Sequence, residues 1–379
     1  MSILKKILLV IIIILFSFII LSLLQERKSI LNKIQVKEGL TINNPDYNYM
    51  VSSVDKVAMD PTLYSSGINS VINSSTKQLP LNQLCIKASY NSAYTGKYIS
   101  DVMIKYVLSR GCRFLDFEVY YLPDSKGNYI TCVGYSTDPN AINPTISNSE
   151  NIHFIDIFQS TLTDAFIKSS SSTYTIVNTK DPLFINIRMK TSKEDMKVLF
   201  DSIQNIINVT SRKPLFQQYF TKTKIDGNTI LNSIDGKVII IFEKNDLIDY
   251  SNSFYNIISN SEKLTKSTYG QIDVNKYIAC PPKVSTDTKV VFNCNHTFNY
   301  VVPDNYYRSQ NNPDIFSSIK EYGNQITTAQ YYVSDNYLIE YENIFKTYNS
   351  AFVSMSNCLF YINKMGKPSN IISPKIIGF

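Results

Sequence analysis

Acidic and basic side chains occur at two-residue spacing in two short apolar runs. In RFLDFEVYY, Asp116 and Glu118 are separated by one residue, and in PLFINIRMK the same holds for Asn186 and Arg188. Successive side chains of a strand point to opposite faces, so each pair shares one face. Two neighbouring carboxylates repel unless a cation or a proton joins them, and a guanidinium is a permanent cationic partner. The spacing predicts either a ligand site or an internal ion-pair network.

These runs belong to four segments that follow one another in order: ASYNSAYTG, GCRFLDFE, CVGYS and DPLFINIR. Together they resemble the catalytic X region of phosphoinositide-specific phospholipase C. The resemblance covers residues 79–244, and a weaker similarity reaches Met355. It implies an α/β fold of the phospholipase C-like phosphodiesterase kind, a distorted (β/α)8 TIM-type barrel with its site at the carboxyl ends of the strands.

The resemblance also implies which residues would perform acid–base chemistry. In this family one histidine acts as the general base and a second as the general acid, and by position they fall on Tyr90 and Val133. Tyrosine has an ordinary pKa of about 10, and valine carries no titratable proton. The two histidines of the chain, His153 and His296, lie in no matching segment. The resemblance therefore predicts a degenerate site with no intact catalytic pair.

The family's calcium positions have changed as well. Its ligand set is Asn, Glu, Asp and Glu; here Asn91 is kept, the middle acids are Asp116 and Glu118, and the last Glu is Arg188. A cation at a calcium ligand position predicts that no calcium or other cofactor binds and that Arg188 neutralises both acids. Bacterial relatives in this family also replace the metal with an arginine. The same four residues are the candidates for binding a ligand.

Three functions fit these residues. The first is a membrane-anchored, catalytically inactive phospholipase C-like protein that keeps its barrel to bind a phosphoinositide, another phosphate-bearing ligand or a protein partner. The second is an active phosphoric diester hydrolase that uses other groups, with Tyr90 and Asp116 as a proton relay. The third is a structural protein of a cellular or viral envelope.

The elements that would hold these residues alternate as strand and helix, which is typical of a parallel sheet. Ser192 and Asp195 form a capping-box pattern at the start of one helix. Strands are predicted over 113–121, 129–134, 182–190, 237–243, 325–333 and 351–355, and helices over 152–168, 193–209 and 337–348, whereas 245–320 stays unassigned.

An apolar run, ILLVIIIILFSFIILSLL, covers residues 7–24 and is just long enough to span a bilayer. No small-residue cleavage pattern follows it, so it predicts an uncleaved transmembrane anchor that contacts membrane lipid. The expected organisation is an anchor over 1–28, a polar stalk over 29–78 and a barrel domain over 79–379. Flanking lysines and arginines slightly favour a cytosolic domain, in a cellular membrane or in a viral envelope or internal membrane.

The composition limits the classes of binding partner that can be expected. The 379 residues are 44% hydrophobic, and the net charge of +6 is scattered along the chain, so no nucleic acid partner is expected. The six cysteines show no zinc-ligand spacing. An even number would allow three disulfides in an oxidising compartment, but Cys85, Cys112 and Cys132 lie in apolar runs, where we expect buried free thiols.

Overall fold

The computed structural model describes residues 72–365, with gaps at 73, 139, 146–151, 168–175, 177, 251–255, 259–263, 269–282, 285–289, 292–297, 304–310, 313, 321 and 334. All of these residues belong to the larger of the two units into which the chain divides, Asp60–Phe379. The predicted anchor and nearly all of the predicted stalk lie outside the described residues. Much of the unassigned 245–320 segment does too.

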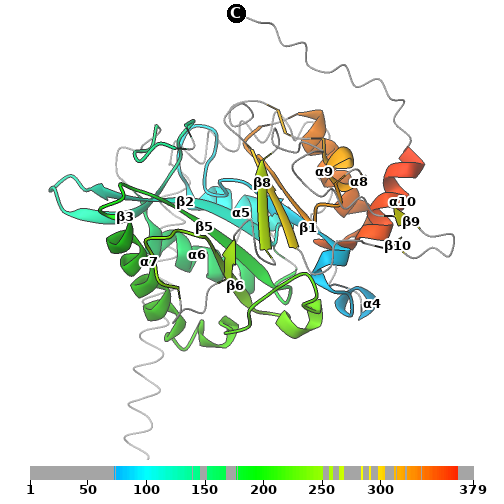
Figure 1. Cartoon of the computed structure of the whole chain (residues 1–379), viewed down its shortest axis with the longest axis horizontal. Coiled ribbons are helices and arrows are strands. Elements are labelled where there is room, and N and C mark those ends of the chain that lie inside the picture. The colour runs from blue at the N-terminus through cyan, green and yellow to red at the C-terminus, as the bar shows by residue number, and fades with distance from the viewer. Residues whose placement is uncertain are drawn as a thin grey trace, which may run out of the picture. The chain divides into compact units, whose positions relative to one another are not determined.

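A curved sheet of parallel strands forms the centre of this unit (Figure 1). Its eight parallel strands are β1 (Leu84–Ser89), β2 (Phe114–Pro123), β5 (Leu183–Lys190), β6 (Val238–Glu243), β7 (Asn256–Ile258), β8 (Leu264–Thr268), β11 (Phe298–Val302) and β12 (Ile326–Ala329). Their order is β7-β6-β5-β2-β1-β12-β11-β8. The last strand, β12, therefore pairs back with the first, as in a TIM-like fold.

Three antiparallel strands extend the sheet. They are β3 (Tyr129–Gly134), which pairs with β2, β4 (Ile152–His153), which pairs with β3, and β13 (Phe352–Ser354), which pairs with β1. A separate ribbon joins β9 (Lys283–Val284) to β10 (Val290–Val291).

The predicted fold class needs correction in two respects. The described strands form a mixed sheet whose path begins at β7 and ends at β8, instead of a closed (β/α)8 barrel. No helix in the described part of the chain is long and apolar enough to cross a membrane, and residues 7–24 lie outside that part. The described fold is an α/β fold on a mixed, TIM-like sheet, without the transmembrane helix that formed part of the prediction.

Helices cover one face of the sheet. They are α4 (Ser74–Lys77), α5 (Asp101–Ser109), α6 (Phe154–Phe166), α7 (Met196–Ser211), α8 (Ile315–Lys320), α9 (Asn336–Tyr348) and α10 (Met355–Met365), with the 3-10 turns η1 (Leu81–Gln83), η2 (Gln217–Tyr219) and η3 (Leu231–Ile234). Figure 1 shows α6 and α7 on one side of the unit and α8, α9 and α10 on the other. The backbone N–H of Asp195 donates to Ser192 Oγ at 3.2 Å, but Asp195 is itself the N-cap of α7 and its side chain forms no capping hydrogen bond, so the predicted capping box does not cap this helix.

The face that the helices cover is called the outer face here, and the opposite one the inner face. Phe200 of α7 packs on Phe242 of β6, which lies on the outer face. The inner face begins with a layer of aromatic rings at the start of the strands, where Phe114 contacts Phe184 and Tyr300. Strands buried on both faces read as almost continuous apolar runs, and so the polar residues within them stand out in the sequence.

One polar network lies on the outer face, between β1 and α9. Glu342 of α9 accepts from Lys87 Nζ at 2.8 Å, Arg110 Nη2 at 2.5 Å and the Tyr331 hydroxyl at 2.5 Å. Burial lowers the pKa of Lys87, although the charge of Glu342 acts in the opposite direction. A single carboxylate thus holds two buried cations and joins the helix to the sheet.

A buried acid lies where the strands begin. Burial raises the pKa of Asp181 to about 6, against the charge of Arg113 and a hydrogen bond from Asn178. The raised value means that the folded chain binds more protons than the unfolded chain between about pH 4 and 6, so stability falls as the pH rises through this range. With about 1.36 kcal/mol per pKa unit, the ionised carboxylate costs the folded state about 3 kcal/mol.

We therefore expect Asp181→Asn to raise the free energy of unfolding by about 2–3 kcal/mol at pH 8 and to change it little at pH 4. Urea denaturation at the two pH values measures this. Asp235→Asn is the matched control, since Asp235 pairs with Lys77 in a partly exposed ion pair and its removal should cost about 1 kcal/mol or less. If Asp181→Asn raises the free energy of unfolding by the same amount at pH 4 and pH 8, the raised pKa of Asp181 is contradicted.

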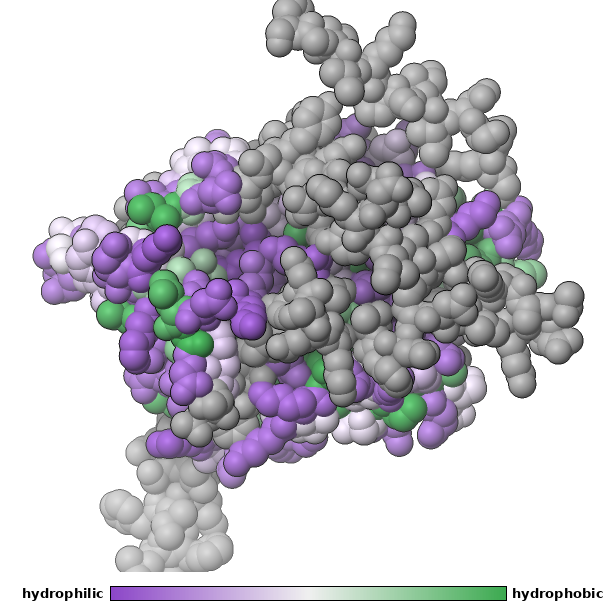
Figure 2. Space-filling view, viewed as in Figure 1, coloured by the Kyte–Doolittle hydropathy of each residue, from purple (hydrophilic) through white to green (hydrophobic). Residues whose placement is uncertain are grey.

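On the face shown in Figure 2, apolar residues are scattered among polar ones over the described part of the surface. Large exposed apolar side chains include Tyr129, Leu247 and Phe360.

Candidate functional site

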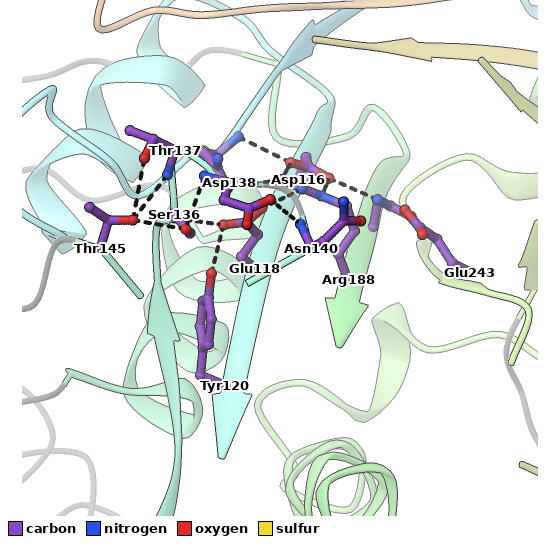
Figure 3. A network of polar contacts seen from close by, with 12 residues as sticks. Asp116, Glu118, Tyr120, Ser136, Thr137, Asp138, Asn140, Thr145, Arg188 and Glu243 are labelled. Atoms are coloured by element: carbon purple, nitrogen blue, oxygen red, sulfur yellow. Dashed lines mark hydrogen bonds and ion pairs between the residues drawn. The ribbon is translucent and has the colours of Figure 1, made fainter. Parts of the chain in front are cut away.

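The centre of the inner face is an ion-pair cluster between β2 and β5. Their parallel register sets Asp116 beside Asn186 and Glu118 beside Arg188. Arg188 donates from Nε to Asp116 Oδ1 at 2.9 Å, from Nη2 to Asp116 Oδ2 at 2.6 Å and from Nη1 to Glu118 Oε1 at 2.6 Å. Figure 3 shows the guanidinium lying between the two carboxylates. The predicted pairing of these three residues is therefore present in the structure.

The second oxygen of Glu118 is held from β2 and from the segment after β3. The Tyr120 hydroxyl and the backbone N–H of Ser136 donate to Glu118 Oε2 at 3.0 and 3.1 Å. Ser136 Oγ lies 2.9 Å from Thr145 Oγ1, which fixes this segment over the carboxylate (Figure 3). Both oxygens of Glu118 thus have protein partners.

Asn91 joins the cluster from the loop after β1. Its Oδ1 accepts from Arg188 Nη2 at 3.0 Å, and its backbone N–H donates to Asp116 Oδ2 at 3.1 Å. Asn91 has a φ of 42°, in the left-handed region that asparagine tolerates better than most residues. The residue retained from the family pattern thus binds the arginine and the acid directly.

Two further residues of the cluster escaped the sequence interpretation. The Tyr300 hydroxyl donates to Asp116 Oδ1 at 3.0 Å. Asn186 Nδ2 donates to the same carboxylate oxygen at 2.8 Å and to the Tyr300 hydroxyl at 3.1 Å. The sequence spacing places Asn186 on the same face as Arg188 but assigns it no partner. Tyr300 lies in the segment left unassigned, and no local pattern there pointed to it.

Electrostatics favour a permanently ionised cluster. Burial alone would raise the pKa of Asp116, but the charge of Arg188 and the hydrogen bonds from Arg188, Asn186 and the Asn91 backbone hold that pKa below its usual range. Burial would lower the pKa of Arg188, yet Asp116, Tyr90 and Glu118 raise it well above the usual value. Asp116 is therefore a poor proton carrier near neutral pH.

Tyrosine rings cover this cluster. The Tyr90 ring lies 4.6 Å from the guanidinium carbon of Arg188, a cation–π contact. Above it, Tyr94 stacks on Tyr135 with ring centroids 4.0 Å apart, and Tyr332 meets both edge-on. These four rings come from the loops after β1, β3 and β12, and we call them the tyrosine cover. Arg188 itself is only 3% exposed.

The second predicted catalytic position lies elsewhere. Val133 pairs with Val119, whereas Gly134 pairs with Glu118, so the Val133 side chain lies on the face opposite the carboxylates. A Cβ built on Gly134 would come 2.8 Å from the Tyr120 ring, so glycine is required for that ring to reach Glu118. His153 lies at the end of β4, away from the cluster, and His296 is outside the described residues. The structure brings Tyr90, but not Val133, to the arginine.

Calcium does not fit these residues. Arg188 occupies the space between the three oxygen-bearing residues that the resemblance retains, and it bonds to Asn91, Asp116 and Glu118 at 2.6–3.0 Å. No group of three or more His, Cys, Asp or Glu side chains suited to a metal ion occurs in the part of the chain that the structure describes.

We expect Arg188→Glu to turn this cluster into a calcium site. The variant should be destabilised in EDTA, because three carboxylates then meet in a buried space, and calcium at 100 times its dissociation constant should restore about 2.7 kcal/mol. Thermal unfolding with EDTA or millimolar calcium measures the recovery. Arg188→Gln is the matched control, since it removes the cation without supplying a carboxylate. If calcium stabilises Arg188→Glu and Arg188→Gln equally, the position of Arg188 is not that of a calcium ligand.

An ion pair lies beside the cluster at the carboxyl ends of the strands. Lys266 of β8 pairs with Glu243 of β6. Burial would raise the pKa of Glu243, but Lys266, Arg188 and Lys190 lower it. These three cations are matched by three carboxylates, Asp116, Glu118 and Glu243. The six side chains together therefore carry no excess charge that would attract an anion.

Comparisons with known proteins are consistent with the geometry. No family model matches the chain, and a search of curated proteins finds no match. Among solved structures, the chain is similar to PLC21 of S. officinalis, at 15% identity and a TM-score of 0.50 over 77% of this chain and 38% of that one. It is also similar to PLC21 of L. pealei, at 14% identity and a TM-score of 0.46, over 73% of this chain and 37% of that one. A third similar structure is a calcium-dependent phosphoinositol-specific phospholipase C from Pseudomonas sp., at 15% identity and a TM-score of 0.31. The match covers 46% of this chain and 61% of that one.

The chain spans less than two fifths of the PLC21 chain of S. officinalis, so the activity and partners of that whole protein do not transfer. What the likeness shows is the fold. The described unit has a phospholipase C-like phosphodiesterase fold, which confirms the resemblance found in the sequence.

Proposed function

We propose that this protein is a non-catalytic member of the phospholipase C-like fold, in which the former reaction centre has become a structural ion-pair cluster. One observation carries the proposal. Arg188 is bonded to Asn91, Asp116 and Glu118 at once, beneath the Tyr90 ring, where the family pattern needs a metal ion and a histidine base. Every oxygen of the two carboxylates already has a protein partner, which leaves none to bind a substrate or move its proton.

The alternative of an active phosphodiesterase gains no support from this geometry. A relay from Tyr90 to Asp116 needs an acid that accepts a proton near neutral pH. Asp116 instead has a lowered pKa, because Arg188 and hydrogen bonds from Asn186 and the Asn91 backbone hold its charged form against the effect of burial. The Tyr90 ring also presents its face to Arg188.

Binding of a phosphoinositide or another phosphate-bearing ligand is a separate part of the proposal and rests on the fold likeness alone. The balanced charges of Arg188, Lys190 and Lys266 against three carboxylates argue for weak attraction of anions to the inner face. We therefore propose that any retained recognition uses surfaces outside the ion-pair cluster, and that the cluster itself serves the stability of the sheet.

The experiment is a headgroup-release assay with the purified full-length chain. Phosphatidylcholine vesicles that contain phosphatidylinositol and its bisphosphate are incubated with and without calcium, beside an active phospholipase C. We expect no release of water-soluble phosphorylated headgroup above the rate without protein. Sedimentation of the same vesicles separates binding from turnover.

Release that the full-length chain catalyses, and that Arg188→Gln abolishes, would overturn the proposal. Release that survives Arg188→Gln at an unchanged rate would point to a contaminating enzyme and would leave the prediction of inactivity for the pure chain intact. Vesicle sedimentation without release would support a recognition role for the fold.

A further inference from the structure

Two cysteines that are far apart in the sequence meet on the outer face. Cys85 lies in β1, which pairs with β13 in antiparallel register, so that Cys85 is opposite Val353. The chain passes directly from β13 into α10 at Met355. The first turn of α10 thus folds back over Cys85. Met355 and Cys358 are three residues apart and therefore share one face of the helix.

Contacts between the sulfur atoms support this placement. Cys85 Sγ lies 3.4 Å from Met355 Sδ. Cys358 follows Met355 by one turn of α10, and burial, and after it the neighbouring Cys85 thiol, raise the pKa of Cys358. Both side chains are deeply buried, with exposed fractions of 2% and 0%. In this structure all four described cysteines are free thiols.

The other described cysteines have different neighbours. Cys112 lies beside Lys87 and Tyr331 in the outer-face network, and Cys132 Sγ is 3.9 Å from the Tyr120 carbonyl oxygen. Burial raises the pKa of each of these two thiols to about 12. Among the described residues, the contact between Cys85 and Cys358 is therefore specific.

We propose that Cys85 and Cys358 form a redox-dependent cross-link that ties α10 to β1. The oxidant is a low-molecular-weight disulfide such as oxidised glutathione. The Cys85 thiolate attacks one sulfur of this disulfide and releases one glutathione thiolate. The Cys358 thiolate then attacks Cys85 Sγ in the mixed disulfide, forms the Sγ–Sγ bond and releases the second. The two thiol protons pass to the released thiolates, and the oxidant gains the two electrons.

Burial determines when this exchange takes place. Thiolates are the reacting species, and burial raises the pKa of Cys358 well above its ordinary value. A buried thiol cannot meet glutathione, so the bond forms before α10 packs, or while it is transiently detached. The chain then remains reduced in a compartment rich in thiols and becomes locked in an oxidising one. The state of this pair thus reports whether the domain folds in a reducing or an oxidising compartment.

The test uses the full-length chain incubated with oxidised glutathione in mild urea, which loosens α10. Free thiols are blocked with iodoacetamide in denaturant, and the digest is mapped by mass spectrometry. We expect a linked peptide pair carrying Cys85 and Cys358, about 2 Da lighter than the sum of the reduced peptides. The oxidised chain should melt about 5–10 °C higher than the reduced chain.

Matched variants keep the result interpretable. Cys358→Ala should abolish both the linked peptide and the shift in melting temperature, whereas Cys132→Ala, at an equally buried position, should keep both. The proposal is overturned if Cys85 and Cys358 are recovered separately alkylated after oxidation, or if either is found linked to Cys280 or Cys294 instead. Since the cross-link does not depend on the reaction centre, this outcome is independent of the headgroup-release assay.

Discussion

Replacing Arg188 by leucine is expected to lower the free energy of unfolding by about 3–5 kcal/mol, because it leaves two buried carboxylates without their cation. Asp116 and Glu118 are fully buried, and Arg188 makes two bonds to the first and one to the second. Leucine restores apolar volume but no positive charge. Urea denaturation followed by circular dichroism measures the loss.

The pH dependence of this variant separates a charge effect from a packing effect. In the unmodified chain the pKa of Asp116 is lowered, so its stabilising contribution is complete above about pH 4 and is lost as the pH falls through the lowered value. Without Arg188, burial raises that pKa, and stability then falls as the pH rises. The deficit of Arg188→Leu should therefore shrink towards pH 4.

Lys197→Leu is the matched control. Lys197 pairs with Asp201 one turn further along α7, but the two side chains are 73% and 52% exposed. Exposed pairs of this kind contribute about 0.3–0.5 kcal/mol. A deficit for Arg188→Leu that is constant from pH 4 to pH 8 would show that lost packing, and not the uncompensated acids, causes the damage.

Glu342→Gln should cost a similar amount, about 3–5 kcal/mol, for the opposite electrostatic reason. The amide keeps the shape of the side chain but leaves Lys87 and Arg110 as two neighbouring buried cations. It also replaces one of the two accepting oxygens by an NH2 group, so Lys87, Arg110 and the Tyr331 hydroxyl are left with a single acceptor. Since Tyr331 precedes Tyr332 of the tyrosine cover, the change should loosen the loop that closes the inner face.

The sign of the pH dependence identifies Lys87 as the group responsible. Its pKa is lowered by burial, and Glu342 is the largest opposing influence, so the variant lowers it further. A base with a lowered folded pKa binds fewer protons in the folded chain, and stability then rises with pH up to the unfolded value near 10.4. Melting temperatures from pH 6 to 10 should thus rise more steeply in Glu342→Gln than in the unmodified chain.

Glu340→Gln, on the same helix, is the control for α9 itself and should leave this slope unchanged. If Glu342→Gln and the unmodified chain show parallel pH profiles, Lys87 is not the cation that loses its partner.

Local pattern was enough to predict most of the central strands. The runs around β2, β3, β5 and β6 match the structure within one or two residues, because their apolar residues are long, β-branched or aromatic and are bounded by turns. The mixed sheet, whose path runs from β7 to β8, was not part of the predicted fold class, and no helix among the described residues, which exclude 7–24, could cross a membrane. Whether β7 and β8 pair depends on backbone contacts between segments without a clear strand pattern, and sequence periodicity does not encode such contacts.

The ion-pair cluster was predictable in part. Two-residue spacing alone placed Asp116 with Glu118, and charge complementarity suggested Arg188 as their partner. Tyr90 was pointed out by the family resemblance, whereas the other rings of the tyrosine cover and Tyr300 of β11 could not be found this way. They come from parts of the chain that are far apart, and an aromatic residue in an apolar chain has many packing roles. The network of Lys87, Arg110 and Glu342 was missed for the same reason: its members come from three elements, and each looks like an ordinary surface charge.

The position of β1 in the sheet determines when its edges can pair while the chain is being synthesised. β1 pairs with β2 soon after both are synthesised, but its other neighbours come late, because Ile86 is matched with Ile326 of β12 and with Phe352 of β13. At about 5–20 residues per second, a ribosome needs roughly 12–50 s to deliver β12 after β1. During this interval one edge of β1 has no native strand to pair with, and such edges invite association with other chains. Protection of that edge during translation is therefore a requirement of this topology.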